Sequence, residues 1–415
     1  MGPITLFDKS FLQSLSVDEF VWFDHFFLAN VCPLFYVETL ADLEKTVREG
    51  RTPEQEVSLI ADKFPEMHSL PNAHHGEICI ANLMGQPVPM TGQIPLAHGR
   101  LVKAGRKTGV VFERSPEADA FSRWQKHEFR EIEQRYAQAW RRTLTTLELN
   151  EVAKGFRAIG IDGKSCKTLE EAKSIAGSVV SARDSPLDRM KLALLFLNVP
   201  QQLHRPILQR WSATNYQTLA DYAPYVAYVL NVEVFFQVAL AANLISTERP
   251  SNRVDIAYLF YLPFCMMFVS SDRLHRRCAP LFLRDDQAFV WGAELKEGLS
   301  QLNDLYAQLP DSTQGKGVMA FAHDPPKDGD FFVAQLWDQH FPRWRERREV
   351  NLTDEAKARL IEELRKTRNA PPLDPDEADF DPMDTDSAAI ERYVRKRKGS
   401  WWQVPKDLKV SETKK

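Results

Sequence analysis

The spacing of apolar residues changes along the chain, and each spacing predicts a different element. Short continuous apolar runs at Ile4–Phe7, Cys265–Val269 and Phe289–Trp291 are typical of buried strands. Apolar residues three or four positions apart predict a helix that starts at Glu38 and closes at Gly50. Strand and helix patterns therefore alternate near the start of the chain and again after residue 250.

The middle of the chain predicts an all-helical block. From Ser115 onward an apolar stripe recurs at helical spacing, with charged residues on the opposite side. Thr168–Glu171 has the pattern of a capping box, where a helix begins. The stretch Tyr225–Ile245 is apolar enough to cross a membrane, but it carries Glu233 near its middle. We interpret it as a buried helix and expect no membrane contact.

Two other parts of the chain have weaker periodicity. The segment Arg51–Val111 is rich in proline, glycine and histidine, which predicts loops. Beyond Pro310 we expect one helix at Thr353–Thr367, followed by an acidic stretch, Asp374–Asp386, and a basic stretch, Arg392–Lys398. This tail is expected to be irregular, either flexible or wrapped over the surface.

Composition narrows the possible functions. The 415 residues are 44% hydrophobic and 27% charged, which excludes a wholly disordered or fibrous chain. The chain has 53 Lys and Arg against 57 Asp and Glu, so it is not basic as a whole. Any binding of a polyanion must therefore use a local positive region or depend on metal ions. The five dispersed cysteines and the absence of a signal-peptide pattern predict a cytoplasmic protein.

Four carboxylates recur at matching places in this pattern. Asp8 follows the first predicted strand and Asp272 follows the second. Glu38 begins the helix behind the first strand, and Asp255 lies on the helix before the second. Carboxyl ends of parallel strands share one crevice, where four acids would repel one another unless cations neutralised them. Mg²⁺ or Mn²⁺ suits such oxygen ligands and could activate water for phosphodiester cleavage.

In their order these motifs resemble those of PIN-domain nucleases. The matching segments begin at Ile4, Pro33, Val254 and Phe268, and end in or contain the four acids. The resemblance implies a small α/β fold with a central parallel sheet and cleavage of single-stranded RNA, less often DNA, with Mg²⁺ or Mn²⁺. It also implies that Asp8, Glu38, Asp255 and Asp272 are catalytic metal ligands, with Asp42 beside them.

The resemblance further implies how the chain is divided. The nuclease domain would be split between residues 1–50 and 250–310, because the second and third acids are far apart in sequence. We expect a loop-rich insertion at 51–114, a helical insertion at 115–249 and an irregular C-terminal extension at 311–415. The predicted fold class is thus α/β, with a small PIN-like sheet split by a large helical insertion.

Basic residues directly after the last acid are candidates for binding the substrate. Arg273, His275, Arg276 and Arg277 would contact phosphates beside the metal ions, or else form a solvated helix face. The expected partner is nucleic acid, RNA ahead of DNA; a regulatory protein or a second copy of the chain is left open. The acidic stretch at 374–386 would mask these bases in a resting state.

Three other functions compete with this one. A haloacid-dehalogenase-type phosphatase also begins with a strand and Asp, but Ser10 stands where that family needs a second Asp. The sequence also contains soft ligands, such as His74, His75 and Cys79, but no Cys-x₂-Cys zinc pair. A non-catalytic scaffold built on the helical block is the remaining alternative.

Overall fold

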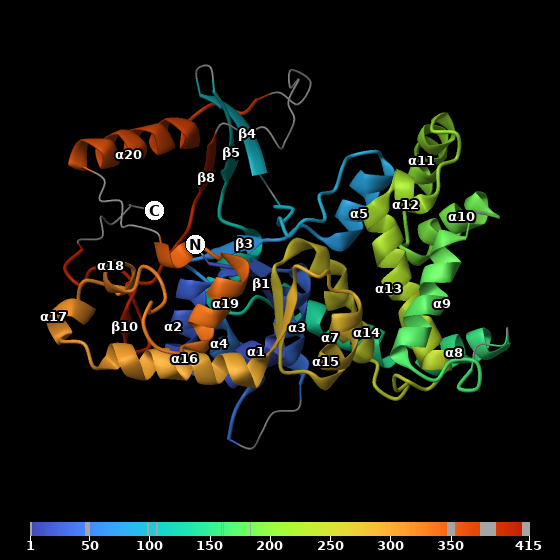
Figure 1. Cartoon of the computed structure of the whole chain (residues 1–415), viewed down its shortest axis with the longest axis horizontal. Helices are drawn as coiled ribbons and strands as arrows, with labels where there is room; N and C mark the ends of the chain where they lie inside the picture. The colour runs from blue at the N-terminus through green and yellow to red at the C-terminus, as the bar shows by residue number, and fades with distance from the viewer. Residues whose placement is uncertain are drawn as a thin grey trace.

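A five-stranded parallel sheet lies at the centre of the computed structural model (Figure 1). The structure describes residues 2–45, 50–97, 99–104, 107–158, 160, 162–182, 184–346, 353–373 and 387–408. In spatial order the strands are β3 (Ser69–Pro71), β2 (Leu28–Val31), β1 (Ile4–Phe7), β6 (Met267–Ser270) and β7 (Ala288–Trp291). The α/β class and the parallel sheet that the sequence predicted are confirmed.

The two central strands come from opposite halves of the chain. β1 pairs with β6 in parallel, with Phe7 opposite Val269, and both residues are fully buried. The chain runs from β1 outward through β2 to β3, and later resumes on the other side of β1 with β6 and β7. The strand order therefore reverses between β1 and β6. In open parallel sheets such a reversal opens a crevice at the carboxyl ends of the strands.

Helices near the chain's start cover the sheet. They are α1 (Lys9–Ser14), α2 (Val17–Phe26) and α3 (Pro33–Ala41), with α16 (Gly292–Ala307) packed on α1 and α2. A capping box between Ser16 and Glu19 starts α2. α3 begins earlier than predicted, because Pro33 occupies its first turn, where a missing N–H costs nothing.

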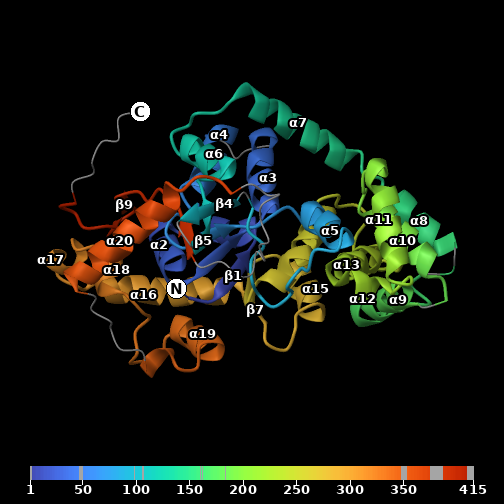
Figure 2. The same cartoon turned by 90° about the horizontal axis from the view of Figure 1, so that it is seen from above.

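The middle of the chain is helical, as predicted. Its elements are α6 (Pro116–Trp124), α7 (Glu131–Thr145), α8 (Leu149–Ala158), α9 (Leu169–Ser181), α10 (Pro186–Phe196), α11 (Gln201–Ala213), α12 (Leu219–Tyr222) and α13 (Pro224–Ala241). The first stripe is broken into α6 and α7 near His127, whose positive φ of 59° ends helical geometry. α7 crosses from the sheet toward the other helices (Figure 2).

The apolar helix α13 lies inside this block. It is the one candidate membrane span by length and composition among the described residues, and 78% of that span is buried within the structure. Its main contacts are with α8 and α9. Glu233, which motivated the interpretation as a buried helix, is paired with Arg253.

The segment 51–114 holds more regular structure than the loops we expected. It contains α4 (Pro53–Ala61), β3, α5 (His75–Leu83) and a hairpin of β4 (Gly99–Ala104) and β5 (Lys107–Phe112). Prolines and glycines suggested loops, but β3 gains its regularity by pairing with β2, a contact that local sequence does not reveal. This segment therefore supplies an edge strand of the central sheet.

The remaining elements follow β6 and extend to the described C-terminal residues. α14 (Asn252–Ala257) and the 3₁₀ helix η2 (Tyr258–Phe264) precede β6, and α15 (Arg273–Cys278) follows it. Beyond α16 come α17 (Asp311–Gln314), α18 (Val318–Phe321), α19 (Phe332–His340), α20 (Asp354–Arg368), β8 (Ser387–Ile390), β9 (Arg397–Lys398) and β10 (Trp401–Trp402), with 3₁₀ turns η1 (Asp42–Glu44), η3 (Ala279–Leu281) and η4 (Trp344–Glu346).

The described end of the tail is wrapped over the sheet domain and is anchored there. β8 pairs with β5, and Trp401 is buried in the main apolar core. The acidic stretch at 374–386 lies outside the described residues. The same core runs from β1 into α13, so the sheet and the helical block share one apolar interior. The domain limits proposed from the sequence stay predictions.

Candidate active site

Asp8 sits at the point where β1 passes into α1. Its side chain caps α1 by accepting the Phe11 N–H at 3.0 Å through Oδ1. The other oxygen, Oδ2, accepts the hydroxyls of Ser10 at 2.7 Å and Ser270 at 2.9 Å. Asp8 is only 4% exposed, so these bonds replace the water that a surface carboxylate would have.

His275 lies against the same oxygen from α15. Its Nδ1 is 3.3 Å from Asp8 Oδ2 and 2.8 Å from Ser270 Oγ. Its Nε2 donates to the backbone carbonyl of Asp255 at 2.7 Å, since a carbonyl can only accept. The ring is fully buried. Asp8, Ser270 and His275 thus form one hydrogen-bonded group that joins the ends of β1 and β6.

Charge pairing decides the protonation of this group. Burial alone would lower the pKa of His275, but the hydrogen bond and charge of Asp8 raise that pKa to about 9. Burial would raise the pKa of Asp8, yet His275 and the neighbouring donors bring it below its usual value. At neutral pH the pair is therefore an imidazolium beside a carboxylate.

Glu38 approaches from α3. Tyr258, in η2, donates its hydroxyl to Glu38 Oε2. Lys9 Nζ donates to the Glu38 backbone carbonyl at 3.0 Å and to Asp42 Oδ1 at 2.9 Å. Burial raises the pKa of Glu38, as does the charge of Asp8, against the opposing effect of Lys9. Lys9 thus links Asp42 to the Glu38 backbone, and a role for Asp42 beside the acids stays a prediction.

Asp255 and Asp272 complete the set. Asp272 lies two residues after the end of β6 and caps α15, accepting the N–H groups of Leu274 and His275. Burial raises the pKa of Asp255 to about 7; His275 opposes this shift, and the charges of Glu38, Asp272 and Asp8 add to it. The carboxylates predicted from distant parts of the sequence therefore lie close enough to repel one another, at the crevice where the strand order reverses.

The expected phosphate contacts divide into two kinds. His275 differs from our expectation, because its buried ring uses both nitrogens within the protein and has no face left for a substrate. Its role is to position Asp8. Arg273, Arg276 and Arg277 have exposed side chains. Arg276 lies over the Trp291 ring at 4.9 Å, and Arg277 donates to the Leu244 carbonyl.

The carboxylates of this site are suitable ligands for a divalent cation, but their side chains are not arranged around a common point. Partly exposed carboxylates on Glu38, Asp255 and Asp272, with mutual repulsion, are the donor set that hard cations prefer. However, within the described residues no three His, Cys, Asp or Glu side chains are already arranged to hold an ion. Asp8 Oδ2 is saturated by three donors, so Oδ1 is its only oxygen with room.

Several residues that support the acids were not singled out from the sequence. Ser270 and Ser10 bridge to Asp8, and Tyr258 holds Glu38. The two serines stand within two residues of a predicted acid or strand end, which is a usable signal. Tyr258 lies within an apolar run, and nothing in the sequence distinguishes it from a tyrosine that only packs in the core.

Known proteins give no independent guide to this site. A scan against protein-family models, a search of curated proteins and a search of solved structures each return no match.

Proposed function

We propose that this chain is a metal-dependent endonuclease that hydrolyses phosphodiester bonds, with single-stranded RNA as the preferred substrate. The observation that carries the proposal is the gathering of Asp8, Glu38, Asp255 and Asp272 at the crevice between β1 and β6. Holding several carboxylates close together costs stability, and a function that needs negative charge explains why they are kept. The parallel sheet and the order of these motifs agree with the resemblance to PIN-domain nucleases.

In this proposal Glu38, Asp255 and Asp272 hold Mg²⁺ or Mn²⁺, with Asp8 contributing through Oδ1. The bound ion supplies an activated water and a charge that stabilises the leaving oxygen. His275 and Ser270 fix Asp8, and Tyr258 and Lys9 fix the helix end that carries Glu38. Exposed Arg273 provides a positive group for the phosphate backbone beside the acids.

The geometry disfavours a phosphatase that uses Asp8 as its nucleophile. Such a carboxylate must reach the phosphorus atom, whereas Asp8 is nearly inaccessible and its Oδ2 is occupied. It also disfavours Ser270 as a nucleophile, because this serine is fully buried. The non-catalytic scaffold remains the competing proposal.

Purified protein incubated with labelled single-stranded RNA and DNA, in Mn²⁺ or in EDTA, tests the proposal. We expect cleavage with Mn²⁺ only, RNA faster than DNA, and a loss of at least 100-fold in Asp255→Asn and in Asp272→Ala. Asp285→Asn is the matched control, because this carboxylate is exposed and lies outside the cluster. Metal-independent cleavage, or equal rates in wild type and Asp255→Asn, would refute the nuclease proposal.

A further inference from the structure

Helix α7 leaves large apolar side chains open to solvent. It continues an apolar stripe whose first members, Phe121 and Trp124 on α6, are fully buried. On α7 the stripe is uncovered, because Ile132 is 67% exposed and Tyr136 is 43% exposed. Side chains four positions apart lie on one side of a helix, so Ile132, Tyr136 and Trp140 form one row, here named the α7 row. In the described part of the chain, the main apolar core includes Phe121 and Trp124 but none of these three.

Two aromatic rings of the α7 row stand parallel to each other. The planes of the Tyr136 and Trp140 rings are 10° apart, and their centroids are 6.5 Å apart. A pair at this spacing stabilises an isolated helix only slightly, so helix stability is a weak reason to keep two large rings at the surface. Exposed aromatic rings beside cationic side chains are the surface on which unpaired bases stack.

Three cations gather around one carboxylate at the end of α3. Lys9 Nζ lies 2.9 Å from Asp42 Oδ1. Lys45 Nζ and Arg141 Nη2 each lie 3.9 Å from the same oxygen. We name Lys9, Lys45 and Arg141 the basic cluster. Asp42 is buried and the neighbouring Glu44 is exposed, and these two acids balance only part of the positive charge.

Two members of the basic cluster keep N–H groups for a further acceptor. The side chain of Lys45 is 52% exposed and that of Arg141 is 39% exposed, and 3.9 Å is too long for a hydrogen bond to Asp42. Arg141 Nε donates to the Ala41 carbonyl at 3.2 Å, so this arginine also caps the carbonyl end of α3. Its two terminal nitrogens and Lys45 Nζ make no hydrogen bond to another described residue. Capping therefore leaves these donors unused.

The basic cluster adjoins both the α7 row and the acids. α7 packs against η1 and against α3, the helix that carries Glu38 (Figure 2). Lys9 Nζ donates to the Glu38 carbonyl at 3.0 Å, and Lys9 directly follows Asp8. At the other end of the cluster, Arg141 directly follows Trp140. A strand of nucleic acid that leaves the acids over the end of α3 would therefore meet cations first and aromatic rings next.

We propose that the α7 row and the basic cluster bind single-stranded RNA beside the acids. A base stacks on Tyr136, and a phosphate accepts hydrogen bonds from Lys45 and Arg141. Residues 135–145 of α7 contain three arginines and no acid, which suits a polyanion. Bases paired in a duplex have no open ring face, so the site selects single strands. That this RNA is the substrate rests on the proposed nuclease function; the binding itself does not.

Fluorescence anisotropy of a labelled RNA of about twelve nucleotides, with the full chain in EDTA, measures binding without metal-dependent cleavage. We expect Tyr136→Ala to weaken binding at least fivefold, because it removes a stacking ring. The double replacement Lys45→Ala with Arg141→Gln should reduce the slope of log K against log salt by about 1.4, since each phosphate contact to a single strand contributes about 0.7. Arg141→Lys, which keeps the charge, should retain the wild-type slope.

Matched controls come from another exposed surface of the chain. Tyr216 and Arg205 are both exposed and line one groove of the helical block. Tyr216→Ala and Arg205→Gln should therefore leave the affinity and the salt slope unchanged. A duplex of the same sequence should bind at least fivefold more weakly than the single strand. Melting temperatures within the range of the control variants show that each variant is folded.

The cleavage assay separates this proposal from the nuclease proposal. If both hold, Tyr136→Ala should raise KM for the RNA with little change in kcat, because the ring lies away from the reacting atoms. Binding that these variants weaken, without any cleavage in Mn²⁺, supports the RNA site and overturns only the nuclease. The RNA site is overturned if Tyr136→Ala and the double variant bind like wild type, if the controls weaken binding as much, or if the duplex binds as tightly. No RNA binding at all would overturn it in favour of an acidic protein segment as the occupant.

Discussion

The replacement Asp255→Asn should stabilise the metal-free protein at alkaline pH. Burial and the neighbouring carboxylates raise the pKa of Asp255 from 3.8 to about 7. Because the folded state holds this proton more tightly than the unfolded state, stability falls as the pH rises from 3.8 through about 7. A shift of about three units corresponds to roughly 4 kcal/mol at pH 8, and solvent relaxation around the partly exposed group reduces this to about 2 kcal/mol.

Urea unfolding at two pH values measures this effect. At pH 8 in EDTA the free energy of unfolding of Asp255→Asn should exceed that of wild type by about 2 kcal/mol, and at pH 4 the difference should fall below half of that value. The control Asp285→Asn should match wild type at both pH values. Mn²⁺ should then stabilise wild type more than Asp255→Asn. Equal stability of wild type and Asp255→Asn at pH 8 would refute the mutual repulsion inferred from the structure.

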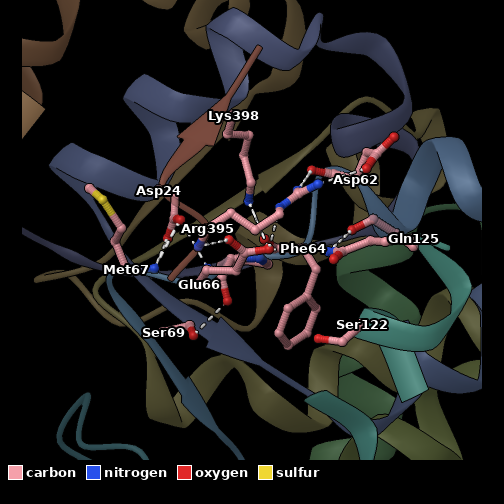
Figure 3. Close-up of polar contacts among 12 residues, drawn as sticks. Asp24, Asp62, Phe64, Glu66, Met67, Ser69, Ser122, Gln125, Arg395 and Lys398 are labelled. Carbon is pink, nitrogen blue, oxygen red and sulfur yellow. Dashed lines mark hydrogen bonds and ion pairs between the residues drawn. The ribbon is translucent and has the colours of Figure 1, made fainter. Parts of the chain in front are cut away.

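Three further predictions concern the groups around the acids and the tail. His275→Gln should destabilise the protein most below pH 6.5, and the difference from wild type should vanish as the pH rises through about 9, since the pKa of His275 is raised to that value; urea titrations across this range measure it. Glu66→Gln leaves buried Lys398 without its ionic partner (Figure 3) and should cost roughly 3 kcal/mol, read from the urea midpoint; an unchanged midpoint would contradict a stabilising role for this ion pair. Truncation after Thr367 removes buried Trp401 as well as the acidic stretch, so we expect a lower melting temperature; higher cleavage with unchanged melting would instead favour masking.

β1 and β6, the strands next to the site, could be predicted because each is a short, mainly apolar segment that ends at polar residues. Ile4–Phe7 and Met267–Ser270 are buried on both faces of a parallel sheet, so every position is apolar or small. β2 has no separate signal in the sequence, because the apolar run Phe26–Ala29 continues from the end of α2 into the strand. β3 has only three residues, and it is a strand because β2 lies beside it.

The acids could be predicted individually, but not their state of charge. Local sequence shows that Asp8 and Asp272 stand at strand ends. It does not show that the ring of His275, three residues beyond Asp272, turns inward to meet Asp8 at 3.3 Å. Nor does it show a cavity beside β3, whose walls come from segments more than 300 residues apart. Both depend on contacts between distant segments, which composition and periodicity do not encode.

The pairing of β1 with β6 has a consequence for synthesis on the ribosome. β1 is made first, but its partner follows about 260 residues later, which takes roughly 10–50 s at usual elongation rates. During that time one edge of β1 has unpaired N–H and C=O groups beside an apolar surface, a combination that favours wrong pairing between nascent chains. The pairing of β1 with β6 therefore forms late and joins segments that are distant in the sequence. We expect the yield of native protein to depend on chaperones that shield this edge until β6 emerges.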